Sequence, residues 1–445
     1  MSLSSTQAIP AQASQRREEA QKFQMSSVWT AFFGFFIDVY DLYLPVMILA
    51  PAYLYFKPPQ LVSPLLDSFI FAAALLGRPA GALFFGYFAD RLGRKRVASV
   101  TMAGAGTAVL LTACMPGYQS IGTASIAGLI VLRFLTGFFA GGQYTGAVTL
   151  AMETCRHSRR GFYGGLIGSS SNLSFIVMSL LGLLLLHLLP HAGLDSPYVQ
   201  WGWRVPFVLG AGLAFGFRYY MTRHVEESHR WLASGEGRTS FAALFHGVQV
   251  GSLVQGFLLM NGLWLAYMVP AVIMPAMLRT VVKLNATQVT TIMLIASATA
   301  FFGFVLGGVV SDRVGRRMAF LSQGIAATVI APILLYILVR LPGDQLVLAG
   351  ALQSIAFFLV GLVWGSGPHS YLNERFHTGN RSAGYGIAFS FAIILPSFFG
   401  VYQNWLSAVM PLRDTAPLLL VIGGLVVVIA AFIGPETRKV NYLDQ

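Results

Sequence analysis

Cysteine and charged residues are both scarce in this sequence. Two cysteines occur among 445 residues, and Asp, Glu, Lys and Arg together make up 10% of the chain. Cys114 lies inside a hydrophobic stretch and Cys155 lies at the end of another, so neither a disulfide nor a metal site is predicted. The first 24 residues are polar and lack an apolar core, which argues against a cleaved signal peptide.

Apolar residues are what the sequence has in excess. Hydrophobic residues make up 56% of the chain, and the mean hydropathy is +0.67, far above the values of soluble domains. A spanning helix needs roughly 20 mostly apolar residues. Twelve such stretches are present, centred near residues 41, 77, 107, 137, 174, 212, 259, 298, 328, 358, 396 and 424. We therefore expect an all-α membrane protein with both termini on one side.

The positive charges are distributed by side of the membrane. A net charge of +12 is compatible with nucleic-acid binding, but most of the Lys and Arg residues fall in the tails and the even-numbered loops. That distribution matches the positive-inside pattern. It predicts cytoplasmic termini, contact with lipid headgroups, no nucleic-acid partner and a location in a bacterial inner membrane.

The sequence contains an internal repeat of about half its length. The stretch "GYFADRLGRKR" at 86–96 returns as "GGVVSDRVGRRM" at 307–318, and "ETCRHSRRG" at 153–161 returns as "ERFHTGNRSAG" at 374–384. Two matches with nearly one spacing predict two six-helix bundles of the same orientation, related by an axis along the membrane normal. The expected segments are a tail (1–26), a first bundle (27–222), a linker (223–245), a second bundle (246–434) and a tail (435–445).

The repeated turns carry opposite charges at the predicted cytoplasmic helix ends. An Asp is followed at once by Arg, Gly and further Arg, which gives a tight turn and charges that bridge neighbouring helices. One interpretation is that these arginines only enforce topology. The other, which we favour, is a cytoplasmic gate made of Asp90, Arg91, Arg94, Glu153, Asp312, Arg313, Arg316 and Glu374.

Two acids interrupt the first hydrophobic stretch, in "FFIDVYDLYL" at 35–44. Asp38 and Asp41 share one helix face, and ionisable groups at this depth are functional candidates. Arg133 and Arg78 lie at similar depth. Protonation of Asp41 would free Arg133 to bind a carboxylate, and desolvation with like-charge repulsion favours a proton on one of the two acids. Which acid carries the proton stays open, and a static packing network is the alternative.

The second half offers polar and aromatic candidates for substrate binding. His369 is either a functional group or a hydrogen-bonded structural residue. Asn261, Trp264 and Tyr267 share one face of the seventh stretch, beside prolines that let the helix bend, and they form either a substrate wall or ordinary packing. Gln143 and Tyr144 are further candidates in the fourth stretch. The weaker candidates are Asn172, Gln353, Trp364 and the cluster from Tyr402 to Trp405.

The paired "DRLGRKR" and "DRVGRR" turns in a duplicated twelve-span chain resemble the major facilitator superfamily. The stretches "GRPAGALFFGYFADRLGRKR", "RFLTGFFAGGQ", "WGWRVPF", "NERFHTGNRSAGYG" and "GPETR" are similar to its metabolite:proton symporter branch. The resemblance implies alternating access, with helices one, four, seven and ten lining a central cavity. The chain has Gln143 where that branch commonly has an acid, and "DVYD" where "EWYD" is usual, so proton coupling is expected in the first helix.

These features predict a secondary active transporter that couples protons to the import of a small organic anion. The run "LTGFFAGGQYTGAV" brings helices close together and is not a nucleotide loop, because it lacks the GK[ST] ending. No cofactor is expected, and nothing indicates an enzyme. Proton-coupled efflux, uptake of a zwitterion such as a betaine, and a non-transporting sensor are the alternatives. A monomer is the default for the fold.

Overall fold

The computed structural model describes residues 8–57, 64–92, 94–142, 144–190, 193–224, 246–376 and 381–440. These residues form helices joined by turns, with no strand among them. Eleven helical segments in this part of the chain are long and apolar enough to cross a membrane. Helix α8 (Arg204–His224) completes the set of twelve. The chain is a multi-pass, all-α membrane protein, as its composition predicts.

The first half supplies six spans. The helices in order are α1 (Ala8–Leu44), α2 (Pro64–Leu92), α3 (Arg94–Ala113), α5 (Ala124–Gly141) continued by α6 (Tyr144–Thr154), α7 (Arg160–Leu188) and α8. A short helix, α4 (Tyr118–Ile121), precedes α5. Part of the predicted N-terminal tail is helical, because α1 begins at Ala8 and runs without interruption into the first span.

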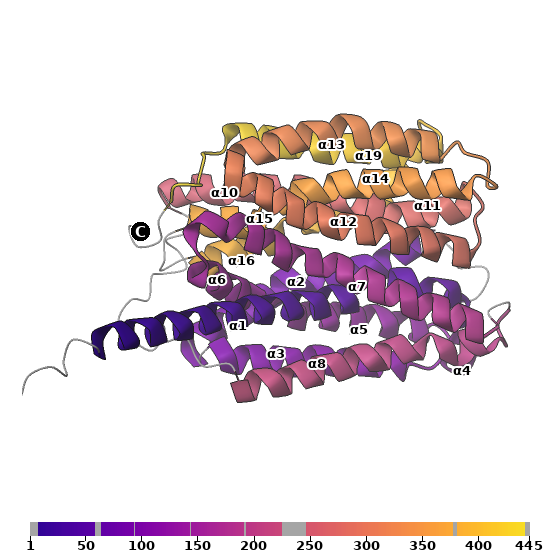
Figure 1. Ribbon diagram of the computed structural model, residues 1–445. Helices are drawn as coiled ribbons and strands as arrows, with labels where there is room; N and C mark the ends of the chain where they lie inside the picture. Colours follow the sequence, from indigo (N-terminus) through magenta and orange to yellow (C-terminus); the bar gives the residue numbers. More distant parts are fainter. Residues whose placement is uncertain are drawn as a thin grey trace, which may run out of the picture.

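The second half repeats this order. Its spans are α10 (Val248–Met268) continued by α11 (Met274–Thr280), α12 (Ala286–Val314), α13 (Arg316–Leu338), α14 (Leu346–Gly365) continued by α15 (Pro368–Arg375), α16 (Arg381–Phe391) with α17 (Ile394–Ser397) and α18 (Phe399–Ser407), and α19 (Leu412–Ile433). Figure 1 shows the two halves side by side along one axis, and the start of α1 lies at the same end of the bundle as the end of α19. We call this end the terminal end.

Helices one, seven and ten depart from regular α-helix within the described residues. A π-helical turn follows α1 at Pro45–Leu49, and another separates α10 from α11 at Val269–Ile273. The fourth span consists of α5 and α6 on either side of Gln143, which lies outside the described residues. The tenth span breaks at Gly367, whose φ of 108° is in the region that favours glycine. Interrupted spans expose main-chain groups near the middle of a membrane protein, where binding sites form.

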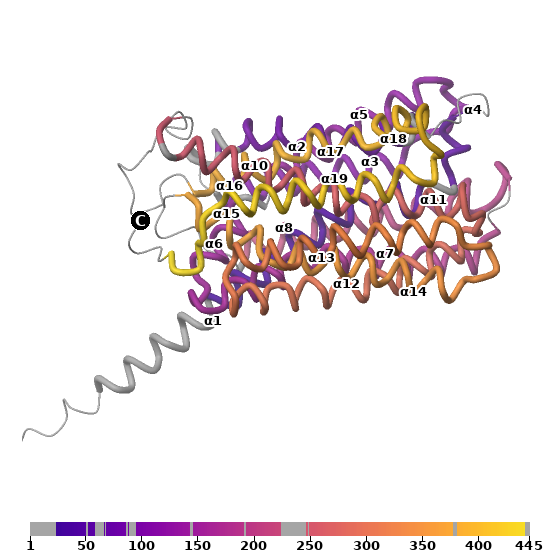
Figure 2. Tube along the Cα trace, turned by 90° about the horizontal axis from the view of Figure 1, so that it is seen from above, coloured from indigo at the N-terminus to yellow at the C-terminus, as the bar shows by residue number. Residues whose placement is uncertain are grey.

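Glycines allow close approach within and between the halves. A Cβ on Gly137 of α5 would lie 1.7 Å from the carbonyl oxygen of Ala74 in α2, and one on Gly365 of α14 would lie 2.1 Å from that of Phe304 in α12. The small-residue run predicted to bring helices together does so here. Between the halves, a Cβ on Gly308 of α12 would lie 2.3 Å from the oxygen of Gly161 in α7. Figures 1 and 2 both show α7 beside α12.

Candidate functional site

The first buried pair joins α1 to α2. Arg78 Nη2 donates to Asp38 Oδ1 at 2.8 Å, and both side chains are buried. Asp38 lies on α1 two turns before the π-helical turn, and Arg78 lies midway along α2. The charges of this acid and this arginine therefore compensate each other, although Asp38 Oδ2 is buried and has no hydrogen-bond partner among the described residues. A buried pair of this kind is stable only while both partners are present.

Asp41 lies one turn further along α1 and has a different environment. Its Oδ1 is buried and has no hydrogen-bond partner among the described residues. A Cβ placed on Gly210 of α8 would lie 2.7 Å from this oxygen. The carboxylate therefore packs directly against α8, and it fits there because residue 210 is a glycine. An unpaired buried carboxylate oxygen is unfavourable unless it binds a proton or a donor.

Arg133 reaches Asp41 through the main chain. Its Nη1 donates to the carbonyl oxygen of Asp41 at 2.9 Å, and its Nη2 lies 3.5 Å from Thr112 Oγ1. Because Pro45 has no N–H, the carbonyl four residues earlier lacks its α-helical donor, and the arginine replaces that donor. The structure thus brings Asp41 and Arg133 together, as expected. The guanidinium binds the main-chain carbonyl oxygen of Asp41, however, and not its carboxylate.

Gln353 plays the equivalent part in the second half. Its Nε2 donates to the carbonyl oxygen of Pro270 at 2.9 Å. In the π-helical turn each carbonyl accepts from the N–H five residues later, as Val269 does from Met274. The carbonyl of Pro270 would accept from residue 275, but Pro275 has no N–H. The interruption predicted beside these prolines is present, and a polar side chain from the tenth span compensates it.

The predicted wall of the seventh span is largely aromatic. Trp264 and Tyr267 pack with Trp364 of α14, at ring-centroid distances of 4.9 and 5.5 Å. The hydroxyl of Tyr267 lies 3.4 Å from Ser171 Oγ of α7, so this residue reaches the other half. Asn261 donates to its own helix, at the carbonyl of Phe257. Gln143 and the side chain of Tyr144 fall outside the part of the chain that the structure describes.

His369 lies at the boundary between the halves. It follows the break at Gly367 and is buried, and its Nδ1 lies 2.8 Å from the hydroxyl of Tyr385 in α16. Its ring packs edge to face with Phe35 of α1, at a centroid distance of 5.4 Å. The sequence signal was the residue type alone, and the contact with α1 places it near the acidic face of the first helix.

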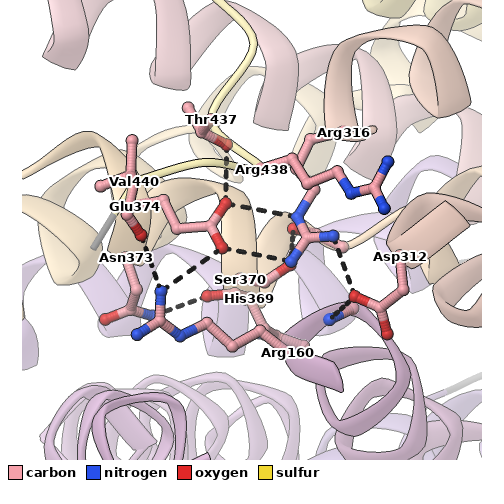
Figure 3. Close-up of polar contacts among 12 residues, drawn as sticks. Arg160, Asp312, Arg316, His369, Ser370, Asn373, Glu374, Thr437, Arg438 and Val440 are labelled. Carbon is pink, nitrogen blue, oxygen red and sulfur yellow. Dashed lines mark hydrogen bonds and ion pairs between the residues drawn. The ribbon is translucent and has the colours of Figure 1, made fainter. Parts of the chain in front are cut away.

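A second polar centre lies at the terminal end, and we call it the gate cluster after the role expected from the sequence (Figure 3). Arg316 Nη1 contacts Asp312 Oδ1 at 2.9 Å, while its Nε and Nη2 donate to the two oxygens of Glu374 at 3.3 and 3.2 Å. Thr437 Oγ1 donates to Glu374 at 2.6 Å. Arg316 and Glu374 are buried. The gate cluster therefore ties α12, α13 and α15 to the segment after α19.

The gate cluster also joins the two halves. The N–H groups of Gly161 and Phe162, in the first turn of α7, each donate to the carboxylate of Asp312 at 2.8 Å. Acids are favoured at helix N-termini, where N–H groups have no helical acceptor. Arg381 of α16 donates to Glu153 of α6 at 2.9 Å. The side chains of Asp90, Arg91 and Arg94 are outside the described residues, and Arg313 is exposed.

Two arginines of the gate cluster were missed in the sequence. Arg160 lies 4.0 Å from Glu374 across the interface, and Arg381 contacts Glu153. Each arginine follows the glutamate of its own half by seven positions, within the repeated stretches. Each pairs with the glutamate of the other half, so the two ion pairs cross. The repeat contained this signal, because a residue pair duplicated at one spacing indicates a shared role.

Two further residues of the segment after α19, Glu436 and Val440, accept hydrogen bonds. Glu436 accepts from the N–H groups of Arg316 and Arg317, at 2.9 and 3.0 Å, and so caps α13. Arg160 Nη1 donates to the carbonyl oxygen of Val440 at 3.0 Å. The part of the predicted tail up to Val440 is thus packed against the gate cluster.

A duplicated bundle of twelve helices, with acids and arginines at its centre and an ion-pair network across one end, defines a membrane transporter. The chain belongs to the Major Facilitator Superfamily, whose profile matches residues 31–401.

Named relatives and solved structures agree with this family. The chain is 28% identical to a citrate-proton symporter of Salmonella typhi over 337 residues, 75% of each protein. It is 32% identical to the alpha-ketoglutarate permease of Escherichia coli (strain K12) over 287 residues, 64% of this chain and 65% of the permease. The structure of the proton:xylose symporter XylE has a TM-score of 0.74 at 19% identity, covering 96% of this chain and 100% of XylE.

Proposed function

We propose that this transporter couples protons to the movement of a small organic anion across a bacterial inner membrane, by alternating access and as a monomer. The observation that carries the proposal is the state of the two acids. Asp38 forms an ion pair with Arg78, whereas Asp41 has no ion pair in the described part of the chain and meets Arg133 only through its main-chain carbonyl. Each acid keeps one buried oxygen without a hydrogen-bond partner there. Asp41 is then the proton carrier, and Asp38 holds its arginine in place.

Charge balance couples the proton to the anion. With Asp41 ionised and no substrate, its charge offsets that of Arg133. A proton on Asp41 leaves the guanidinium uncompensated, and a substrate carboxylate restores neutrality. Either ligand alone leaves a net charge at the middle of the membrane, which is unfavourable by several kcal/mol. The empty and the doubly loaded protein change conformation readily, and the singly loaded forms do not.

The gate cluster closes the cytoplasmic side in this scheme. Its two crossed ion pairs and the contact from Asp312 to α7 connect the halves, so all of them must break before the terminal end opens. The closed cluster is the state in which the central site receives its ligands from outside. The charged loops at this end favour a cytoplasmic orientation.

The relatives support an organic acid as the substrate. A citrate-proton symporter and an alpha-ketoglutarate permease align over most of the chain. Both names describe anionic substrates, which an arginine binds well. The proposal extends this substrate class to the present chain, whose Arg133 has the matching charge.

Uptake into liposomes tests the proposal. Purified protein is reconstituted with a pH dye inside, and labelled citrate, alpha-ketoglutarate, succinate, lactate, benzoate or betaine is added with an inward proton gradient. We expect an organic anion to accumulate with internal acidification. Asp41→Asn should abolish accumulation but keep exchange of labelled for unlabelled anion. Accumulation without acidification, or an unchanged Asp41→Asn variant, would refute proton coupling through this residue.

A further inference from the structure

Three arginines gather beside the gate cluster without joining it. Arg313 is in the last turn of α12, Arg317 is in the first turn of α13, and Arg438 follows α19. None of the three has an ion pair within the described residues, whereas Arg160, Arg316 and Arg381 of the gate cluster each contact a carboxylate there. We call Arg313, Arg317 and Arg438 the peripheral arginines.

One carboxylate holds the main chains of the peripheral arginines together. Glu436 accepts from the N–H of Arg317 at 3.0 Å through one oxygen and from the N–H of Arg438 at 2.8 Å through the other. The Nη1 of Arg438 donates to the carbonyl oxygen of Arg313 at 2.6 Å. The three arginines are therefore neighbours in space, and together with Glu436 they carry a net charge of +2 (3 − 1).

The peripheral arginines border an apolar surface. Arg317 Nη2 donates to the carbonyl oxygen of Phe432, in the last turn of α19, at 2.7 Å, and its guanidinium carbon lies 5.7 Å from the centre of the Phe432 ring. Phe432 is 66% exposed, and Met318 of α13 is 55% exposed. Large apolar side chains that are exposed on a membrane-spanning helix face lipid. The arginines therefore lie where acyl chains meet headgroups, the depth that long basic side chains prefer.

The guanidinium groups keep donors for a ligand. Arg317 and Arg438 each use one nitrogen on a main-chain carbonyl, and these bonds orient the two planar groups. The side chain of Arg313 is exposed. Guanidinium groups bind phosphate oxygens in bidentate fashion, so neighbouring arginines favour a phosphate group.

We propose that the peripheral arginines bind the phosphate of an anionic phospholipid, such as phosphatidylglycerol, whose acyl chains lie along α13 and α19 beside Met318 and Phe432. The net positive charge favours a lipid with a negative headgroup over a zwitterionic one. The bound lipid bridges α13 and the segment after α19, which adds to the contacts that hold this segment at the gate cluster. The assignment to the cytoplasmic leaflet rests on the proposed function, whereas the site itself does not.

Lipid titration of the purified protein in detergent tests the site. Native mass spectrometry counts the lipids bound as phosphatidylglycerol or phosphatidylcholine with the same acyl chains is added. We expect the first phosphatidylglycerol to bind at least about tenfold more tightly than phosphatidylcholine. Arg317→Gln and Arg438→Gln should each weaken phosphatidylglycerol binding about fivefold, the factor for one basic side chain at an anionic lipid surface, and should leave phosphatidylcholine binding within about twofold.

Arg223→Gln is the matched control. Arg223 lies near the end of α8, in the first half, and stacks on Tyr219 at 5.3 Å as Arg317 does on Phe432. Its replacement removes the same charge from the protein but none from the peripheral arginines. Phosphatidylglycerol affinity should therefore stay within about twofold of the wild type. Arg317→Lys keeps the charge and should recover part of the affinity that Arg317→Gln loses.

The outcomes separate a lipid site from general surface charge. Equal affinity for the two lipids, or an equal loss in Arg223→Gln and Arg317→Gln, would overturn the proposal. Inorganic phosphate that binds as tightly as phosphatidylglycerol would indicate a site for a free anion and would overturn it as well. A melting temperature that phosphatidylglycerol raises in the wild type but not in the Arg317→Gln, Arg438→Gln double variant would support it. No readout requires uptake, so failure of the proposed function would leave this test intact.

Discussion

The two halves share a scaffold but differ in charge at their centres. Each first span bends at a π-helical turn, and each bend leaves a carbonyl that a side chain from the fourth span of that half satisfies. In the first half the side chain is Arg133, and in the second half it is Gln353, 220 positions later (353 − 133). Capping the bend therefore requires only a hydrogen-bond donor. The charge of Arg133, with Asp38, Asp41 and Arg78 around it, is an addition specific to the first half.

At the terminal end, by contrast, the charges are distributed symmetrically between the two halves. There the two halves contribute equivalent residues, and the ion pairs from Glu153 to Arg381 and from Glu374 to Arg160 cross the interface. A gate must connect both halves, so each half keeps its share of the charges. A binding site for one small anion can be asymmetric, because a single ligand need not contact the two halves in the same way.

The largest effect is expected where the first half differs most from the second. Asp38→Asn removes the carboxylate and leaves the guanidinium of Arg78 buried beside a neutral amide. We expect a loss of about 3–5 kcal/mol in the free energy of unfolding, the range for a broken buried ion pair. Gln353→Leu, at the bend of the second half, removes a neutral hydrogen bond and should lose about 1–3 kcal/mol. Unfolding by SDS titration in mixed micelles measures both, and equal losses would contradict an energetic difference between the centres.

The next test separates the two roles of Arg133. Arg133→Gln gives the first half the residue that the second half uses, so the bend stays capped and any loss in the free energy of unfolding comes from Asp41, which no longer has a compensating charge. Arg133→Leu removes the cap and should lose about 1–3 kcal/mol more. Both variants lack the charge, so uptake of the organic anion should fall at least about 30-fold in each. Retained uptake in Arg133→Gln would show that the arginine serves the bend alone.

Hydropathy and the internal repeat predict most of the fold. Twelve apolar stretches and two duplicated turns are local properties of the sequence, and the helices follow them. The pairing of side chains was harder to predict from the sequence. The sequence set Arg133 opposite Asp41 and left the partner of Arg78 open, and only the register of α2 and α5 against α1 decides these contacts. That register depends on glycine contacts between helices, which the sequence pattern does not resolve to one turn.

In the gate cluster, too, the sequence predicted the residues but not their pairing. The acids were predicted from the repeat, whereas the crossing of the ion pairs depends on how the halves meet. Arg160 and Glu374 are separated by more than 200 positions, and no local pattern specifies which glutamate an arginine contacts. The segment after α19 was predicted only as a tail, whereas Glu436 and Thr437 contact α13 and α15.

The two glutamates of the crossed ion pairs should contribute unequally to keeping the terminal end closed. Glu374 is fully buried and binds Arg316 through both oxygens, whereas Glu153 is partly exposed. Glu374→Gln should therefore open the terminal end more than Glu153→Gln. Cys155, which lies in the turn after α6 and is buried, reports opening through its rate of alkylation in a Cys114→Ser background. We expect an increase of about tenfold for Glu374→Gln and a few-fold for Glu153→Gln, and the reverse order would refute the difference.

The smallest expected effect concerns the protonation of the same cysteine. Cys155 lies between the fourth and fifth spans, and burial raises the pKa of its thiol to about 12, although Arg160 lowers it in part. Because the thiolate is the nucleophile, alkylation of the closed protein should be slow at pH 8 and should rise up to about tenfold per pH unit through pH 10. Opening of the gate admits water and lowers the thiol pKa toward its ordinary value near 8.5. In Glu374→Gln the alkylation rate should then level off at a lower pH than in the wild type, and identical pH profiles would show that the turn after α6 stays buried when the ion pairs of the gate cluster are weakened.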